Sequence, residues 1–178
     1  MHSWRSCIAL RWDGTNKWAN MELCDVVDQF GNQTGHMVTR GTKLAAGEYY
    51  LVVHVWIRDE NNNYLIQQRA LHLESGPGAW ATTVGYVLAG EESITGAIRE
   101  VKEELGIQLL STHLKRLERH TLENRLEDIW LAEVQRNSIG IPVPGNEAAD
   151  CRWIARTDLE EMVNQGGFFR YSYHGRLI

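Results

Sequence analysis

The stretch from Gly85 to Ile107 reads GYVLAGEESITGAIREVKEELGI and contains the clearest helix signal of the chain. Its pattern predicts a helix from Ser93 to Leu105, with Ser93 as the N-cap and Gly106 as the residue that stops it. The apolar side chains recur at helical spacing and form one stripe: Ile94, Ala97, Ile98, Val101 and Leu105. The stretch therefore predicts an amphipathic helix that packs on a core.

Three glutamates lie together on another face of this predicted helix. Around the helix axis, Glu103 stands about 60° to one side of Glu100 and Glu104 about 40° to the other, within about one turn. Like charges at these spacings repel, and the C-terminal half of a helix disfavours anions. A solvated acidic face explains such a cluster as readily as a binding site does. If the cluster is a site, its crowded anionic oxygens suit magnesium or manganese.

Nine positions at fixed spacing extend this pattern on both sides of the glutamates. They are Gly85, Glu91, Arg99, Glu100, Val101, Glu103, Glu104, Gly106 and Ile107. In these positions the chain resembles the Nudix hydrolase family. The resemblance implies an α/β fold, namely a Nudix-type α/β/α sandwich with a mixed β-sheet and a loop–helix–loop metal site. It also implies that Mg²⁺ or Mn²⁺ assists hydrolysis of a diphosphate linkage in a small nucleoside diphosphate-type substrate.

The same resemblance implies a role for the matched side chains. Glu100, Glu103 and Glu104 would be metal ligands. The backbone carbonyl of Gly85 would be a possible further ligand. Arg99 and Glu91 would hold loop and helix together, and Arg99 stands four residues before Glu103, where it can fix the carboxylate. Glu100 and Arg99 are therefore candidate catalytic residues, whereas Glu91 and Gly106 are structural parts of the motif.

Two further candidates lie outside the motif. Glu147 follows Pro142, Pro144 and Gly145 in a loop ahead of a predicted strand, and we expect it to be the general base that activates water. A solvated loop acid explains Glu147 equally well, and Glu100 is the competing candidate for the base. Arg69 offers a bidentate guanidinium to a substrate phosphate, and a structural ion pair is the alternative.

The segment from Met21 to about Asp150 resembles one branch of the superfamily, that of isopentenyl-diphosphate isomerase. The resemblance rests on Glu22, Asp25 and Asp28, and on the runs 65–69 and 80–83, with His54 on the central strand. The isomerases need a catalytic cysteine after the tryptophan, followed by a metal-binding histidine. Here Gly85 stands about where the cysteine would be, and the segment from Trp80 to Leu88 contains neither a cysteine nor a histidine. An isomerase is thus the alternative to a hydrolase, and we expect His54 to be a core histidine rather than a ligand.

The remaining strands are predicted from apolar and β-branched runs. Expected strands cover 21–28, 49–57, 64–69, 80–84, 114–121, 128–134 and 150–155, and a second helix covers 157–164 with a capping box from Thr157 to Glu160. Residues 1–20, which lack periodicity, are expected to be an N-terminal extension. Residues 21–178 would then form a single Nudix domain.

Composition excludes several classes of protein. The chain has 178 residues and a net charge of −5, which argues against binding duplex nucleic acid through a basic face. Its three cysteines, Cys7, Cys24 and Cys151, form no metal-binding or disulfide pattern. No apolar run approaches the ~20 residues of a membrane span. We therefore expect a cytoplasmic protein with no membrane partner, and a homodimer stays open.

Overall fold

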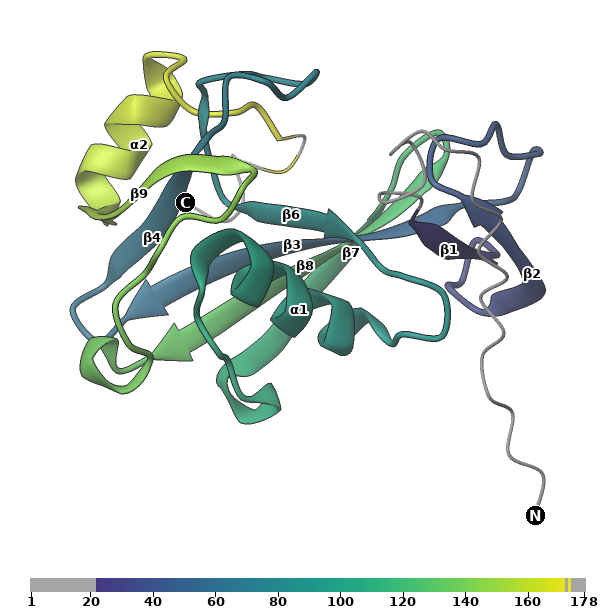
Figure 1. Cartoon of the computed structure of the whole chain (residues 1–178), viewed down its shortest axis with the longest axis horizontal. Coiled ribbons are helices and arrows are strands. Elements are labelled where there is room, and N and C mark those ends of the chain that lie inside the picture. The colour runs from purple at the N-terminus through teal and green to yellow at the C-terminus, as the bar shows by residue number, and fades with distance from the viewer. Residues whose placement is uncertain (1–21, 172, 174–178) are drawn as a thin grey trace, which may run out of the picture.

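The computed structural model describes residues 22–171 and 173, so the expected extension over 1–20 lies outside the described residues. These residues form nine strands and two α-helices, whose arrangement Figure 1 shows. The strands are β1 (Leu23–Val27), β2 (Gln33–Thr39), β3 (Tyr50–Asp59), β4 (Asn63–Arg69), β5 (Trp80–Ala81), β6 (Thr83–Tyr86), β7 (Leu114–Thr121), β8 (Arg125–Val134) and β9 (Ala148–Ala155). The helices are α1 (Ser93–Leu105) and α2 (Arg156–Asn164).

The main sheet is mixed, as the sequence predicts. Its strands follow the order β5-β4-β3-β8-β7, with β6 added to β3 and β9 added to β4. β3 and β8 run parallel along their whole length, and the other pairs are antiparallel. β1 and β2 form a separate small sheet. β3, which is buried from end to end, is the centre of the molecule because both of its faces are covered.

Each face of the main sheet is covered by one helix. Alternate side chains of β3, such as Val53 and Val55, pack with Ala97 and Val101 of α1. Trp56, which points the other way, packs with Leu159 of α2. In Figure 1, α1 lies in front of β3 and β8, whereas α2 lies beside β9. The arrangement is an α/β/α sandwich, which confirms the predicted fold class.

The structure corrects both predicted helix N-caps. The N-cap of α1 is Glu92, and Ser93 instead accepts a hydrogen bond from the indole of Trp130 at 3.0 Å. The capping box from Thr157 to Glu160 is absent, because α2 begins after Ala155 and Glu160 binds Arg156 at 2.8 Å. The predicted stop at Gly106 is correct, since this residue has a φ of 67°. An N-cap depends on where the chain enters the helix, which spacing alone does not fix.

Two strands also differ from expectation. β2 went unpredicted because its side chains are mostly exposed and polar, so no buried face leaves a pattern in the sequence. The single strand predicted over 80–84 is divided into β5 and β6 at Thr82, whose hydroxyl donates to the Val55 carbonyl at 2.5 Å. This division lets β5 pair with β4 and β6 pair with β3. β6 then places Gly85 against α1, next to Glu100.

Candidate active site

The predicted glutamate cluster lies where α1 meets the end of β6. Glu100 and Glu104 are almost fully buried, with 8% and 5% of their surface exposed, whereas most of the Glu103 side chain is exposed. A cavity of about 400 Å³ is lined by these three glutamates together with Gly85 and Glu147. The structure therefore brings together five of the residues singled out from the sequence. A solvated acidic face does not describe Glu100 and Glu104.

Arg99 is the centre of the ion-pair network on this face of α1. Its guanidinium contacts Glu91 at 2.9 Å, Glu100 at 2.8 Å and Glu103 at 3.0 Å. It also donates to the Tyr86 carbonyl at 2.8 Å, while Glu91 accepts the backbone N–H of Leu88 at 3.0 Å. The predicted tie between loop and helix is thus present, and one arginine orients three carboxylates.

The buried carboxylates carry more negative charge than their surroundings offset. Burial raises the pKa of Glu100 to about 7, although Arg99 opposes the shift. Burial and the nearby charge of Glu100 raise the pKa of Glu104 to about 8. The amide of Gln67 donates to Glu104 at 2.5 Å, and the Gln67 Oε1 atom is buried without a hydrogen-bond partner among the described residues. A divalent cation would stabilise such closely spaced carboxylate oxygens, because it offsets their negative charge.

This donor set fits Mg²⁺ or Mn²⁺. Within residues 22–171 and 173, no group of three or more acidic, histidine or cysteine side chains forms a cage that could hold a metal ion. Mg²⁺ needs no such cage, since it commonly takes one or two carboxylates and completes its shell with water and substrate phosphate. Glu100 and Glu104 would supply the carboxylates from inside the cavity. Glu103, which the Arg99 side chain holds at the rim, would be the outer ligand.

Glu147 reaches the same cavity because its loop docks on the C-terminal end of α1. The N–H of Val143 donates to the Leu105 carbonyl at 2.9 Å, and that of Gly145 donates to the Glu104 carbonyl at 2.8 Å. Gly145 must be glycine here, since a Cβ would overlap the backbone oxygen of Glu103. The Glu147 carbonyl then accepts the N–H of Ala70 at 2.9 Å. The loop is therefore tied on both sides of Glu147, which lines the cavity.

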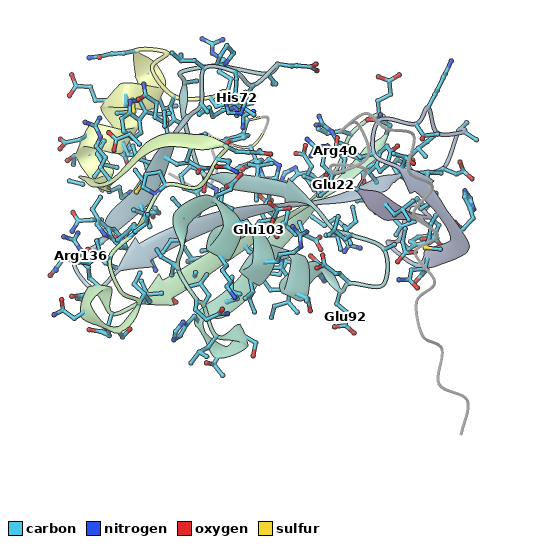
Figure 2. The ribbon with its side chains drawn as sticks, viewed as in Figure 1. Glu22, Arg40, His72, Glu92, Glu103 and Arg136 are labelled. Atoms are coloured by element: carbon cyan, nitrogen blue, oxygen red, sulfur yellow. The ribbon has the colours of Figure 1, made fainter. Side chains whose placement is uncertain are left out.

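Sequence reasoning missed two residues at the edge of this cavity as site residues, Glu22 and Arg40. They form an ion pair at 2.7 Å, and Figure 2 shows them close to each other and apart from Glu92. Arg40 also lies over the Tyr86 ring at 4.5 Å. Glu22 was visible as part of the isomerase-like pattern. Arg40 follows the unpredicted β2, and no sequence signal indicated it.

Arg69 and His54 lie in a second cavity, of about 450 Å³, that adjoins the first. The Arg69 Nε donates to the Ser75 carbonyl at 2.8 Å. Within the described chain Arg69 makes no ion pair, so the structural ion pair considered as the alternative is not found. His54 is buried and its Nδ1 lies 2.6 Å from the Tyr173 hydroxyl. The Nδ1 atom of His54 thus has a partner inside the core, and the residue also lines this cavity.

Comparison with known proteins agrees with this geometry. A family model described as the NUDIX domain matches residues 48–171, which is most of the chain. The chain belongs to the Nudix hydrolase family. An uncharacterized Nudix hydrolase of Listeria monocytogenes is 33% identical over 159 residues, covering 89% of this chain and 94% of that protein. The family assignment confirms the resemblance and supports a hydrolase.

Other relatives of this Nudix protein include isomerases. An isopentenyl-diphosphate Delta-isomerase of Ruegeria pomeroyi is 39% identical over 103 residues, which covers 53% of this chain and 57% of the isomerase. The solved structure of DR0079 from Deinococcus radiodurans covers 86% of this chain and 96% of its own, with a TM-score of 0.68 at 17% identity. That likeness supports the fold alone. Neither helix in the described part of this chain is long and apolar enough to cross a bilayer.

Gly85 leaves room beside β6 for the carboxylate of Glu100. A Cβ on Gly85 would overlap the carboxylate of Glu100. The absence of a side chain at 85 is therefore what allows Glu100 to stay buried beside the strand. Any larger residue there must displace the carboxylate.

We expect Gly85→Ala to lower turnover by about 10²-fold or more, because a displacement of ~1 Å in a catalytic group can cost that much. The fold should survive, since the overlapped group is the end of a side chain that can move. Activity and melting temperature of the purified variant check this. A variant with full activity and unchanged Mg²⁺ dependence would contradict the proposed place of Glu100 in the site.

Proposed function

We propose that this Nudix protein hydrolyses the diphosphate linkage of a nucleoside diphosphate-type substrate with Mg²⁺ or Mn²⁺. The observation that carries the proposal is the pair of buried glutamates, Glu100 and Glu104, that line one cavity. Two buried carboxylates with raised pKa values are costly unless a cation or a proton joins them. Glu100, Glu103, Glu104 and the Gly85 carbonyl would hold the cation. A bound divalent cation supplies charge that offsets the phosphoryl oxygens.

The chain's own residues would perform the other tasks. Glu147 would accept a proton from the attacking water, since a carboxylate in hydrogen-bond reach of that water can act as a general base. Arg99 would hold Glu100 and Glu103 in place through its contacts at 2.8 and 3.0 Å. Arg40, at the boundary of the two cavities, would face the diphosphate. Arg69 would bind the substrate further from the cleaved bond.

The direct test is hydrolysis of a substrate panel with Mg²⁺. The panel holds a nucleotide sugar, NADH, a dinucleoside polyphosphate and nucleoside diphosphates, and phosphatase-coupled release of phosphate reports cleavage. We expect Mg²⁺-dependent cleavage of at least one compound, and none in EDTA. No cleavage of any panel member would contradict the proposal for nucleotide substrates.

The isomerase relatives make isopentenyl-diphosphate isomerisation the competing activity. The glycine at position 85 argues against it, because this residue has no side chain to act as the acid or base that the isomerases' cysteine supplies. We expect no conversion of isopentenyl diphosphate to its dimethylallyl isomer during prolonged incubation with Mg²⁺. Product analysis by chromatography, with a known isomerase as positive control, decides the point. Conversion at enzymic rates would refute the assignment to hydrolysis.

A further inference from the structure

The larger cavity, which adjoins the glutamate site, is basic although the chain is acidic. The two cavities share part of their lining, including Arg40, Gly85 and Glu147. Charged side chains in the lining of the larger one comprise four arginines against two glutamates: Arg40, Arg69, Arg125, Arg170, Glu127 and Glu147. The formal sum is +2, in a chain whose net charge is −5. A cavity with this excess of positive charge favours an anionic ligand.

Three of these arginines lie away from the glutamate cavity, and among the described residues Arg125 is the one of the three with a carboxylate within ion-pair distance. Among the described residues, Arg69 contacts the Ser75 carbonyl, and its guanidinium lies 5.6 Å from the Phe169 ring. The nearest carboxylate to Arg125 is Glu127 at 3.7 Å, and the buried Arg125 Nε has no hydrogen-bond partner among the described residues. Arg170 has no carboxylate within ion-pair distance in the part of the chain that the structure describes. These guanidiniums therefore retain donors that a ligand could use.

His54 adds a buried donor to the same cavity. The residue is 3% exposed, and the short contact at 2.6 Å joins its Nδ1 to the Tyr173 hydroxyl. A phenol that donates to Nδ1 leaves the ring proton on Nε2, an assignment made from the hydrogen-bond geometry. Nε2 is 3.7 Å from Glu127 and has no hydrogen-bond partner within residues 22–171 and 173. The Glu127 carboxylate at 3.7 Å lies beyond ordinary hydrogen-bond length, so a ligand acceptor atom closer to Nε2 would complete a hydrogen bond that the cavity itself does not supply.

We propose that His54, Arg69, Arg125 and Arg170 form a second anion subsite, which binds a phosphate group of the substrate other than the diphosphate that is cleaved. The inference rests on the proposed hydrolase function, since it assumes that the cleaved linkage lies at Glu100 and Glu104. Phosphate offers several acceptor oxygens and a charge that guanidinium donors match in geometry. Substrates whose only anionic group is the cleaved diphosphate, such as nucleotide sugars and NADH, would leave this subsite empty.

The kinetic test uses substrate pairs that differ in phosphate content. NADPH and NADH differ by one ribose phosphate, and diadenosine tetraphosphate and diadenosine diphosphate differ in chain length, so the two pairs distinguish the two sources of the extra phosphate. We expect the phosphate-rich member of at least one pair to have a kcat/KM about tenfold higher or more in the wild-type chain. Arg125→Gln and Arg170→Gln should each reduce that ratio severalfold. Arg156→Gln, an exposed change of the same charge on α2, should leave it unaltered.

A binding measurement keeps this inference separate from the proposed activity. In EDTA the glutamate cluster repels anions, so calorimetric binding of inorganic pyrophosphate reports the basic cavity. We expect the double variant Arg125→Gln, Arg170→Gln to bind pyrophosphate at least about tenfold more weakly than wild type and Arg156→Gln. If no panel substrate is cleaved but this dependence holds, the proposed function fails, and the four residues form an anion site that is not tied to that reaction. The proposed subsite is wrong if the two members of each pair have the same kcat/KM and the double variant binds pyrophosphate as tightly as wild type.

Discussion

Replacing Glu104 by glutamine is expected to lower turnover by about 10³-fold or more, corresponding to roughly 4 kcal/mol of transition-state stabilisation. The same substitution should make the metal-free protein more stable. Glu104 is 5% exposed, beside buried Glu100, and a glutamine there keeps the hydrogen bond to Gln67 without the charge. Loss of activity together with a gain in stability is typical of a side chain whose charge serves a ligand rather than the fold.

The pKa values of the two buried glutamates also predict how the stability of the metal-free protein changes with pH. The pKa values of Glu100 and Glu104 are about 7 and about 8 in the folded chain, against an ordinary value of 4.5. Between pH 4.5 and 8 the folded state therefore holds more protons than the unfolded state, so stability in EDTA should fall as the pH rises through this window. The fall should be smaller in Glu104→Gln, with a gain of at least about 1 kcal/mol near pH 8. Mg²⁺ should restore stability to the wild type.

Melting temperatures from pH 5 to 8, with EDTA and with Mg²⁺, measure both effects beside turnover. Glu92→Gln is the matched control, because Glu92 caps the same helix without a side-chain capping bond and lies outside the glutamate cavity. It should keep wild-type activity and the wild-type pH profile. A Glu104→Gln protein with full turnover, or one less stable than wild type in EDTA, would overturn the metal-site assignment.

Replacing Glu147 by glutamine should lower kcat by about 10²–10⁴-fold while the affinity for Mg²⁺ changes little. Glutamine preserves size and hydrogen bonding but accepts no proton at neutral pH. The backbone ties of this loop to Glu104, Leu105 and Ala70 do not involve the substituted side chain, so the fold should be unaffected. A selective loss of kcat would identify the base.

Glu100→Gln is the comparison that separates the two candidates for the base. If Glu100 is mainly a ligand, its variant should lose metal affinity as well as turnover, whereas the Glu147 variant should lose turnover alone. Turnover at saturating Mg²⁺ and calorimetric Mg²⁺ binding measure the two quantities. A Glu147→Gln protein within a few-fold of wild type would return the role of base to Glu100.

The sequence of segment 85–107 determines the local structure of the site without reference to the rest of the chain. Local spacing fixes α1, its apolar stripe and its glutamate face, because helical periodicity connects residues only three or four positions apart. Gly106 ends the helix as predicted because a left-handed residue is a local requirement. The contact of Arg99 with Glu103 is of the same kind, since it joins adjacent turns of one helix. These features need no knowledge of the rest of the chain.

The tertiary structure alone decided which of these groups are buried and what surrounds them. Glu100 and Glu104 look alike to Glu103 in sequence, and only packing against β6 and β4 buries the first two beside Gly85 and Gln67. Arg40, which follows a strand with no apolar pattern, reaches the site through the pairing of β2 with β1. The basic cavity gathers arginines from residues 40 to 170. Contacts between segments so distant leave no periodic trace, because periodicity records the geometry of one element and not the placement of one element on another.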